Sequence, residues 1–159
     1  MNIKIKKMAE ELITEVEIEV DQKKIDELQS VLEKKQGELV KKVYAVSMTA
    51  KDLDVYDDII SSLEWRGKEA LGILEIAKKI EESKNEGIKN GAIFMNALEI
   101  EATHYFLNKF TGKGKSLAND FIRIFKSFEQ ALTNISMDNK ELDDLKKDLA
   151  AAQQGLKTE

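Results

Sequence analysis

The sequence predicts a mainly α-helical protein, and three observations support this class. The chain of 159 residues contains no Pro, the residue that breaks helix interiors. Charged residues make up 35% of the chain beside 42% hydrophobic residues, a balance typical of helices with solvated outer faces. Apolar residues also recur at alternating spacings of three and four. We therefore expect one compact domain, a bundle of about four or five helices with one long central helix.

The N-terminal segment, residues 1–48, is expected to contain one helix and a small β element. Valine and isoleucine alternate with glutamate up to residue 20, and this period of two favours a short strand at 14–20. The same stretch also fits one face of a helix. Asp21 is a good N-cap for a following helix, and Gly37 is a suitable stop for it. Residues 39–48 are compatible with either a helix or a second strand.

The remainder, residues 49–159, is predicted to form the helical bundle. Thr49 and Asp52 resemble a capping box, which predicts a long helix over about 50–82. An apolar seam follows this helix at coiled-coil spacing, and it serves either as a surface for a partner or a second copy, or as the core face of the bundle. The seam consists of Leu53, Tyr56, Ile60, Leu63, Gly67, Ala70, Leu74 and Ala77, with Trp65 beside it.

Three further helices are expected after this one. Turn residues over 83–91 indicate a connection, and the largely apolar stretch 92–110 predicts a central helix. Ser116 is expected to cap a fourth helix after a glycine-rich turn. Asp138 and Glu141 resemble a capping box that opens a last, highly charged helix.

The turn before the fourth helix carries a spaced pattern of apolar and small residues. The pattern consists of Phe110, Gly112, Gly114, Ala118, Phe121 and Ile122. It resembles the helix–hairpin–helix motif of DNA-binding proteins, although that family has an apolar residue where this chain has Lys113. The resemblance implies that backbone amides over 110–122 hold a phosphate. A helix N-terminus with nearby lysines attracts anions, and the residues concerned are Lys109, Gly112, Lys113, Gly114, Lys115 and Ser116. The alternative is a plain helical hairpin with solvated lysines.

A second constellation is the pair Glu101 and His104, three residues apart on one predicted helix face. A Glu-x-x-His pair resembles the metal-binding motif of ferritin-like carboxylate proteins, and that resemblance implies a metal site in the bundle. His104 is the only histidine, so a second histidine ligand within the chain is excluded. The alternatives are a buried His–Glu hydrogen bond that orders the core and a partly exposed pair without a binding role.

Composition narrows the remaining function classes. The chain has no Cys and a single His, which leaves few groups for nucleophilic catalysis, so we expect no enzyme activity and no cofactor. The net charge of −5 weighs against a dedicated nucleic-acid binder. The leading hypothesis is a non-enzymatic protein-interaction or assembly module that binds a protein partner or a second copy of itself. Phosphate-mediated nucleic-acid binding and metal binding are the alternatives. No apolar run long enough for a membrane helix occurs, and a cytoplasmic location is expected.

Overall fold

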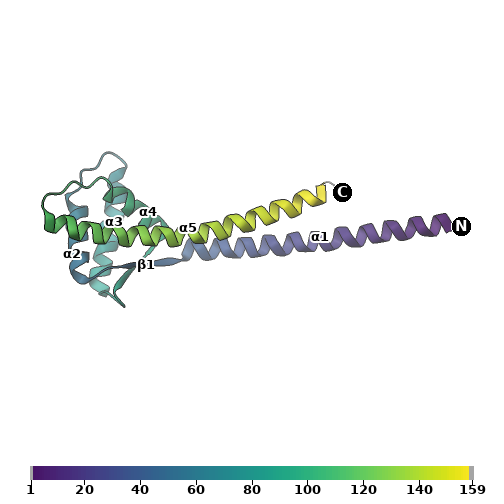
Figure 1. Cartoon of the computed structure of the whole chain (residues 1–159), viewed down its shortest axis with the longest axis horizontal. Helices are drawn as coiled ribbons and strands as arrows, with labels where there is room; N and C mark the ends of the chain where they lie inside the picture. Colours follow the sequence, from purple (N-terminus) through teal and green to yellow (C-terminus); the bar gives the residue numbers. More distant parts are fainter. Residues whose placement is uncertain (1, 158–159) are drawn as a thin grey trace. The chain divides into compact units, whose positions relative to one another are not determined.

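The computed structural model describes the backbone of residues 2–157 and the side chains of residue 19 and residues 21–155. Over these residues five helices and two strands follow one another along the chain (Figure 1). They are α1 (Asn2–Lys41), β1 (Val43–Ser47), α2 (Ala50–Ser62), α3 (Glu69–Glu86), β2 (Ala92–Asn96), α4 (Ala97–Leu107) and α5 (Lys115–Lys157). The predicted mainly α class is therefore confirmed. None of the described helices is long and apolar enough to cross a membrane.

The described chain divides into two compact units. The two-helix unit combines residues 2–39 with residues 138–157, and the mixed unit comprises residues 40–137. The two-helix unit thus combines two segments that are far apart in the sequence.

The two-helix unit pairs α1 with the C-terminal part of α5, and the two run antiparallel (Figure 1). On α1, Ile25 and Leu32 are buried and Leu28 between them is half-buried. On α5, the half-buried leucines repeat at the same spacings of three and four, at Leu142, Leu145 and Leu149. This is the spacing of a coiled-coil seam. An ion pair flanks it, with Lys35 Nζ 3.0 Å from Glu141 Oε2.

The mixed unit contains a two-stranded antiparallel sheet in which Tyr44 pairs with Met95 and Val46 with Ile93. All four side chains are buried, whereas their neighbours Ala45 and Phe94 are exposed. Successive side chains of a strand point to opposite faces, so one face of the sheet packs on the core. The other core residues include Met48, Leu53, Ile59, Ile60, Ile76, Ile80, Ile100, Phe106, Leu107, Ile124, Phe128, Ala131 and Ile135.

Two polar contacts cross this core. Tyr56 and Thr103 are fully buried, and their hydroxyl oxygens lie 2.8 Å apart. The Tyr56 ring meets Phe128 edge-on, with 5.2 Å between the centroids. Burial raises the pKa of Tyr56 far above its usual value, so this hydroxyl is a neutral hydrogen-bonding group. The contact joins α2 to α4, and the ring pair joins α2 to α5.

The second polar contact centres on the buried carboxylate of Asp52. One oxygen accepts a hydrogen bond from Arg123 Nε at 3.0 Å, and the other accepts one from the backbone N–H of Thr49 at 3.2 Å. Thr49 Oγ1 in turn accepts from the Asp52 N–H, so the predicted capping box is confirmed. The bond to Arg123 lowers the pKa of Asp52.

The strand predicted over 14–20 is wrong, because this stretch belongs to α1. Asp21 therefore does not begin a helix, and Gly37 does not end one. Helix propagation explains the difference. Once a turn is nucleated each further residue adds a hydrogen bond at little cost, and the Glu and Lys residues here are good helix formers. The strand option for 39–48 is confirmed at β1.

The single helix predicted over 50–82 is also wrong. α2 ends at Ser62, Leu63 adopts an extended conformation, and Gly67 has φ +51° before α3 begins. The predicted seam is thereby divided between two helices. The connection predicted over 83–91 begins at Gly87, because α3 continues to Glu86.

The central helix predicted over 92–110 is replaced by strand β2 and helix α4. Asn96 ends the strand and caps the helix in a capping box with Glu99, a sequence signature that the apolar pattern obscures. The last helix predicted from Asp138 is wrong as well, since α5 runs through that position from Lys115. Ser116 lies inside the first turn of α5 and is not its cap.

Candidate functional site

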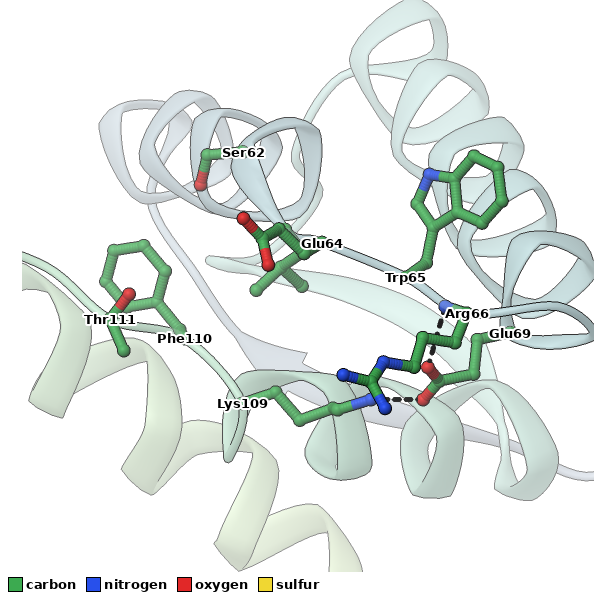
Figure 2. Close-up of a pocket in the computed structure, with 9 residues that line it drawn as sticks. Ser62, Glu64, Trp65, Arg66, Glu69, Lys109, Phe110 and Thr111 are labelled. Carbon is green, nitrogen blue, oxygen red and sulfur yellow. Dashed lines mark hydrogen bonds and ion pairs between the residues drawn. The ribbon is translucent and has the colours of Figure 1, made fainter.

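A pocket of about 540 Å³ lies within the mixed unit, between the α2–α3 connection and the α4–α5 turn (Figure 2). Cavities of this size are typical of small-molecule sites. The lining side chains come from two short segments far apart in sequence. They are Ser62, Leu63, Glu64, Trp65, Arg66 and Glu69 on one side, and Lys109, Phe110 and Thr111 on the other.

Local backbone geometry builds both walls. At the end of α2, Ser62 Oγ donates to the Ile59 carbonyl at 2.8 Å, and the chain leaves the helix in extended form. On the opposite wall, the N–H groups of Lys109 and Phe110 donate to carbonyls in the last turn of α4. The first amides of α3 donate to the carbonyls of Arg66, Gly67 and Lys68, so they are not free to bind an anion.

Glu69 is the most heavily bonded group of the pocket. Its carboxylate accepts hydrogen bonds from the Lys109 ammonium, the Tyr105 hydroxyl at 2.9 Å and the Arg66 backbone N–H at 3.0 Å. These donors, Lys109 foremost, lower the pKa of Glu69 to about 2, and Glu69 raises the pKa of Lys109. A carboxylate held in its charged form near neutral pH is a weak base, so this group orders the pocket and offers little for proton transfer.

Two charged side chains of the lining make no ion pair or side-chain hydrogen bond with the described residues, namely Glu64 and Arg66. Figure 2 shows the Glu64 carboxylate on the Ser62 side and the Arg66 guanidinium beside Lys109. Trp65 and Phe110 lie on opposite sides of the view. Trp65 is the only tryptophan of the chain, and its side chain is 55% exposed.

The glycine turn predicted as a phosphate site adjoins this pocket. Phe110 stacks on Phe121 with 5.3 Å between centroids, and a Cβ on Gly112 would lie 2.8 Å from the Phe110 ring. Gly114 has φ +92°, a conformation that suits glycine. These three positions therefore have packing and backbone roles.

The lysines of the turn differ in their surroundings. Lys109 forms an ion pair with Glu69, whereas Lys113 and Lys115 are exposed. The structure thus leaves two of the three predicted lysines accessible at the start of α5. Whether the turn binds phosphate stays a prediction.

The two residues of the predicted metal site, Glu101 and His104, lie in different environments. Glu101 is exposed, while His104 is half-buried and stacks on Phe125 with 5.1 Å between centroids. His104 Nδ1 lies 3.5 Å from Asn108 Nδ2. Among the described residues no group of three or more potential metal ligands occurs. Metal binding at this pair stays a prediction that the geometry does not strengthen.

The predicted interaction seam does not form one surface. Leu53, Tyr56 and Ile60 are buried in the core, and Gly67 lies in the turn before α3. Only Trp65 and Leu74 are exposed hydrophobic side chains of the set. The remaining members, Leu63, Ala70 and Ala77, are half-buried.

The structure therefore joins Trp65, from the predicted seam, and Lys109, from the predicted phosphate turn, in one pocket. Sequence reasoning missed Glu64, Arg66 and Glu69 because it placed them inside a continuous helix. Gly67, two residues before an acidic first turn, was the available signal for a break there.

Comparison of the chain with models of known protein families, with curated proteins and with solved structures found no match.

Proposed function

We propose that this chain is a non-enzymatic protein-interaction module, with self-association as the form of interaction to test first. The observation that carries the proposal is a set of exposed leucines on the outer faces of two helices. Leu71 and Leu74 on α3 are 67% and 66% exposed, and Leu98 on α4 is 77% exposed. Each offers apolar area whose removal from water is worth about 25 cal/mol per Å².

The helix pattern explains why these leucines do not serve the fold. On α3 the buried positions are Ile76, Ile80 and Ser83, which recur at helical spacing on one face. Leu71 and Leu74 fall on the opposite face, so their packing contributes little to the mixed unit. Apolar residues on outer helix faces are the residues that helix-mediated interfaces use.

The bonding of Glu69 in the pocket and of Asp52 in the core also supports a binding role over a catalytic one. Glu69 is committed to three donors, and Asp52 is saturated by Arg123 and Thr49. Neither group combines an accessible position with the intermediate pKa that general acid–base catalysis uses.

The test is molar mass by size-exclusion chromatography with light scattering over a wide concentration range. We expect a concentration-dependent oligomer that Leu71→Ser/Leu74→Ser converts to monomer. Val31→Ser, at a 51% exposed position of α1, is the matched control and should leave the mass unchanged. Circular dichroism checks that both variants fold. A wild-type monomer at every concentration, or an oligomer that survives the α3 variant, would refute self-association through this face.

A second candidate is sequence-independent binding of nucleic acid at the α4–α5 turn. The specific observation in its favour is the exposure of Lys113 and Lys115 next to the N-terminus of a long helix. Phosphate contacts of this kind weaken steeply with salt. Binding of a labelled duplex should be lost in Lys113→Glu/Lys115→Glu and retained in Lys146→Glu/Lys147→Glu, which makes the same charge change on the C-terminal part of α5. Equal binding by the two variants would exclude the turn.

A further inference from the structure

We infer that the pocket between the α2–α3 connection and the α4–α5 turn binds a zwitterionic small molecule, an apolar amino acid or a dipeptide, with its carboxylate on Arg66 and its ammonium on Glu64. The inference is independent of self-association. It rests on the charge balance of the lining, on the placement of the two charged groups and on the apolar side chains beside them.

The charge balance comes first. The lining contains two acidic and two basic side chains. Glu69 and Lys109 form an ion pair, so their charges cancel and both are held in place. Glu64 and Arg66 remain, and neither has an ion-pair partner among the described residues. The free charges of the pocket are therefore one negative and one positive group, which is the complement of a neutral ligand that carries both signs.

The placement of these groups comes second. Glu64 and Arg66 are two residues apart in a non-helical connection, so their Cα atoms are at most about 7 Å apart. Figure 2 nevertheless shows their charged ends turned to different parts of the pocket. A molecule with a charged group at each end suits two groups of opposite charge placed in this way. Arg66 can hold a carboxylate through two parallel N–H donors.

The remaining lining suits the body of such a ligand. Leu63, Trp65 and Phe110 supply apolar surface, and Thr111 contributes a hydroxyl. The volume of about 540 Å³ accommodates an aromatic or branched side chain together with water. Glu64 and Arg66 are both exposed, so a ligand with a single charge would engage only one of them, whereas a zwitterion would engage both.

The pocket contains an intrinsic fluorophore that can report ligand binding. Trp65 is the only tryptophan, it lines the pocket, and more than half of its side chain is exposed. A ligand that covers the indole removes it from water, so the emission of the full-length protein should shift on binding.

The experiment titrates the full chain with free phenylalanine, free leucine and the dipeptide Leu-Phe, and follows Trp65 emission and calorimetric heat. N-acetylated and C-amidated forms of the same compounds remove one charge at a time, and sodium acetate and inorganic phosphate test an anion alone. We expect saturable binding of a zwitterion at micromolar to millimolar concentration. Loss of either charge should weaken it about tenfold to a hundredfold, the usual value of a charged hydrogen bond.

Variants locate the binding. Arg66→Gln should abolish the change in Trp65 emission caused by compounds with a free carboxylate. Glu64→Gln should bind the free and the N-acetylated compounds equally well. Lys68→Gln is the matched control, because Lys68 is exposed and does not line the pocket. The inference is overturned if none of the zwitterions binds, if the blocked compounds or simple anions bind equally well, or if Arg66→Gln and Lys68→Gln behave alike. Whether the free amino acid or the dipeptide binds more tightly distinguishes the two sources of the same chemistry.

Discussion

The hydrogen bond between Tyr56 and Thr103 should couple α2 to α4 energetically. Both side chains are fully buried, and the two oxygens lie 2.8 Å apart. No buried side-chain polar atom among the described residues lacks a partner. Removing one hydroxyl therefore leaves the other without a partner in an apolar core, at a cost of about 1–3 kcal/mol.

The magnitude for each variant follows from what remains in place. Tyr56→Phe keeps the ring against Phe128, and Thr103→Val nearly preserves shape, so each single change should cost about 1–3 kcal/mol of unfolding free energy. The double variant has no orphaned hydroxyl. Its destabilisation should not exceed that of the worse single variant, which implies a coupling energy of about 1 kcal/mol or more.

The assay is guanidinium unfolding of the four proteins, followed by circular dichroism and by Trp65 emission. Tyr105→Phe is a useful control, because Tyr105 is 54% exposed although its hydroxyl donates to Glu69, and its loss should cost less than about 1 kcal/mol. Additive single effects, within about 0.5 kcal/mol, would show that the two hydroxyls do not depend on each other and would refute this reasoning.

Three further predictions concern charge and backbone conformation. Since Arg123 holds the pKa of Asp52 below its usual 3.8, the resulting stabilisation is complete above that value and is lost as pH falls through the folded-state pKa. Urea unfolding at a series of pH values should show that the free energy of unfolding falls less at acid pH in Asp52→Asn than in the wild type. Gly37→Ala should raise the free energy of unfolding by about 0.5–1 kcal/mol, because Gly37 lies inside α1 with nothing near its missing Cβ. Gly114→Ala should lower it by about 1 kcal/mol through its φ of +92°, although the space is open there too. Equal effects of the two alanines in thermal unfolding would contradict the backbone explanation.

Local signals predicted those elements whose cause is local. The capping box at Thr49 and Asp52 requires only a few adjacent residues, and the structure confirms it. The β-forming residues before Met48 form a strand. The box at Asn96 and Glu99 was equally readable, but a continuous apolar run concealed it, because a buried strand followed by a buried helix has no periodicity that separates them.

Residues typical of helix ends gave wrong predictions at two positions, because the helix continues on both sides of each. Gly37 and Asp138 both have the residue types of helix boundaries, yet α1 and α5 pass through them. One glycine costs about 1 kcal/mol in a helix. In the two-helix unit that cost is offset by a seam in which Ile25 and Leu32 are buried. Packing of this kind is not visible in either segment alone.

The candidate pocket depended most on tertiary structure. Lys109 and Trp65 were each singled out for separate reasons, and nothing in the sequence related them. Their meeting requires the break after Ser62, the start of α3 at Glu69 and the packing of α4 against α3, where Phe106 lies beside Gly72.

The sequence by itself determined the helical class, the apolar repeats and the absence of thiol chemistry, because composition and periodicity act on each segment independently. Only the tertiary structure decided which end of the chain pairs with which, which members of the seam are buried, and which charges face one another. Those outcomes depend on contacts between residues far apart in the chain, such as Glu69 with Lys109 and Asp52 with Arg123, and a one-dimensional pattern does not specify such contacts.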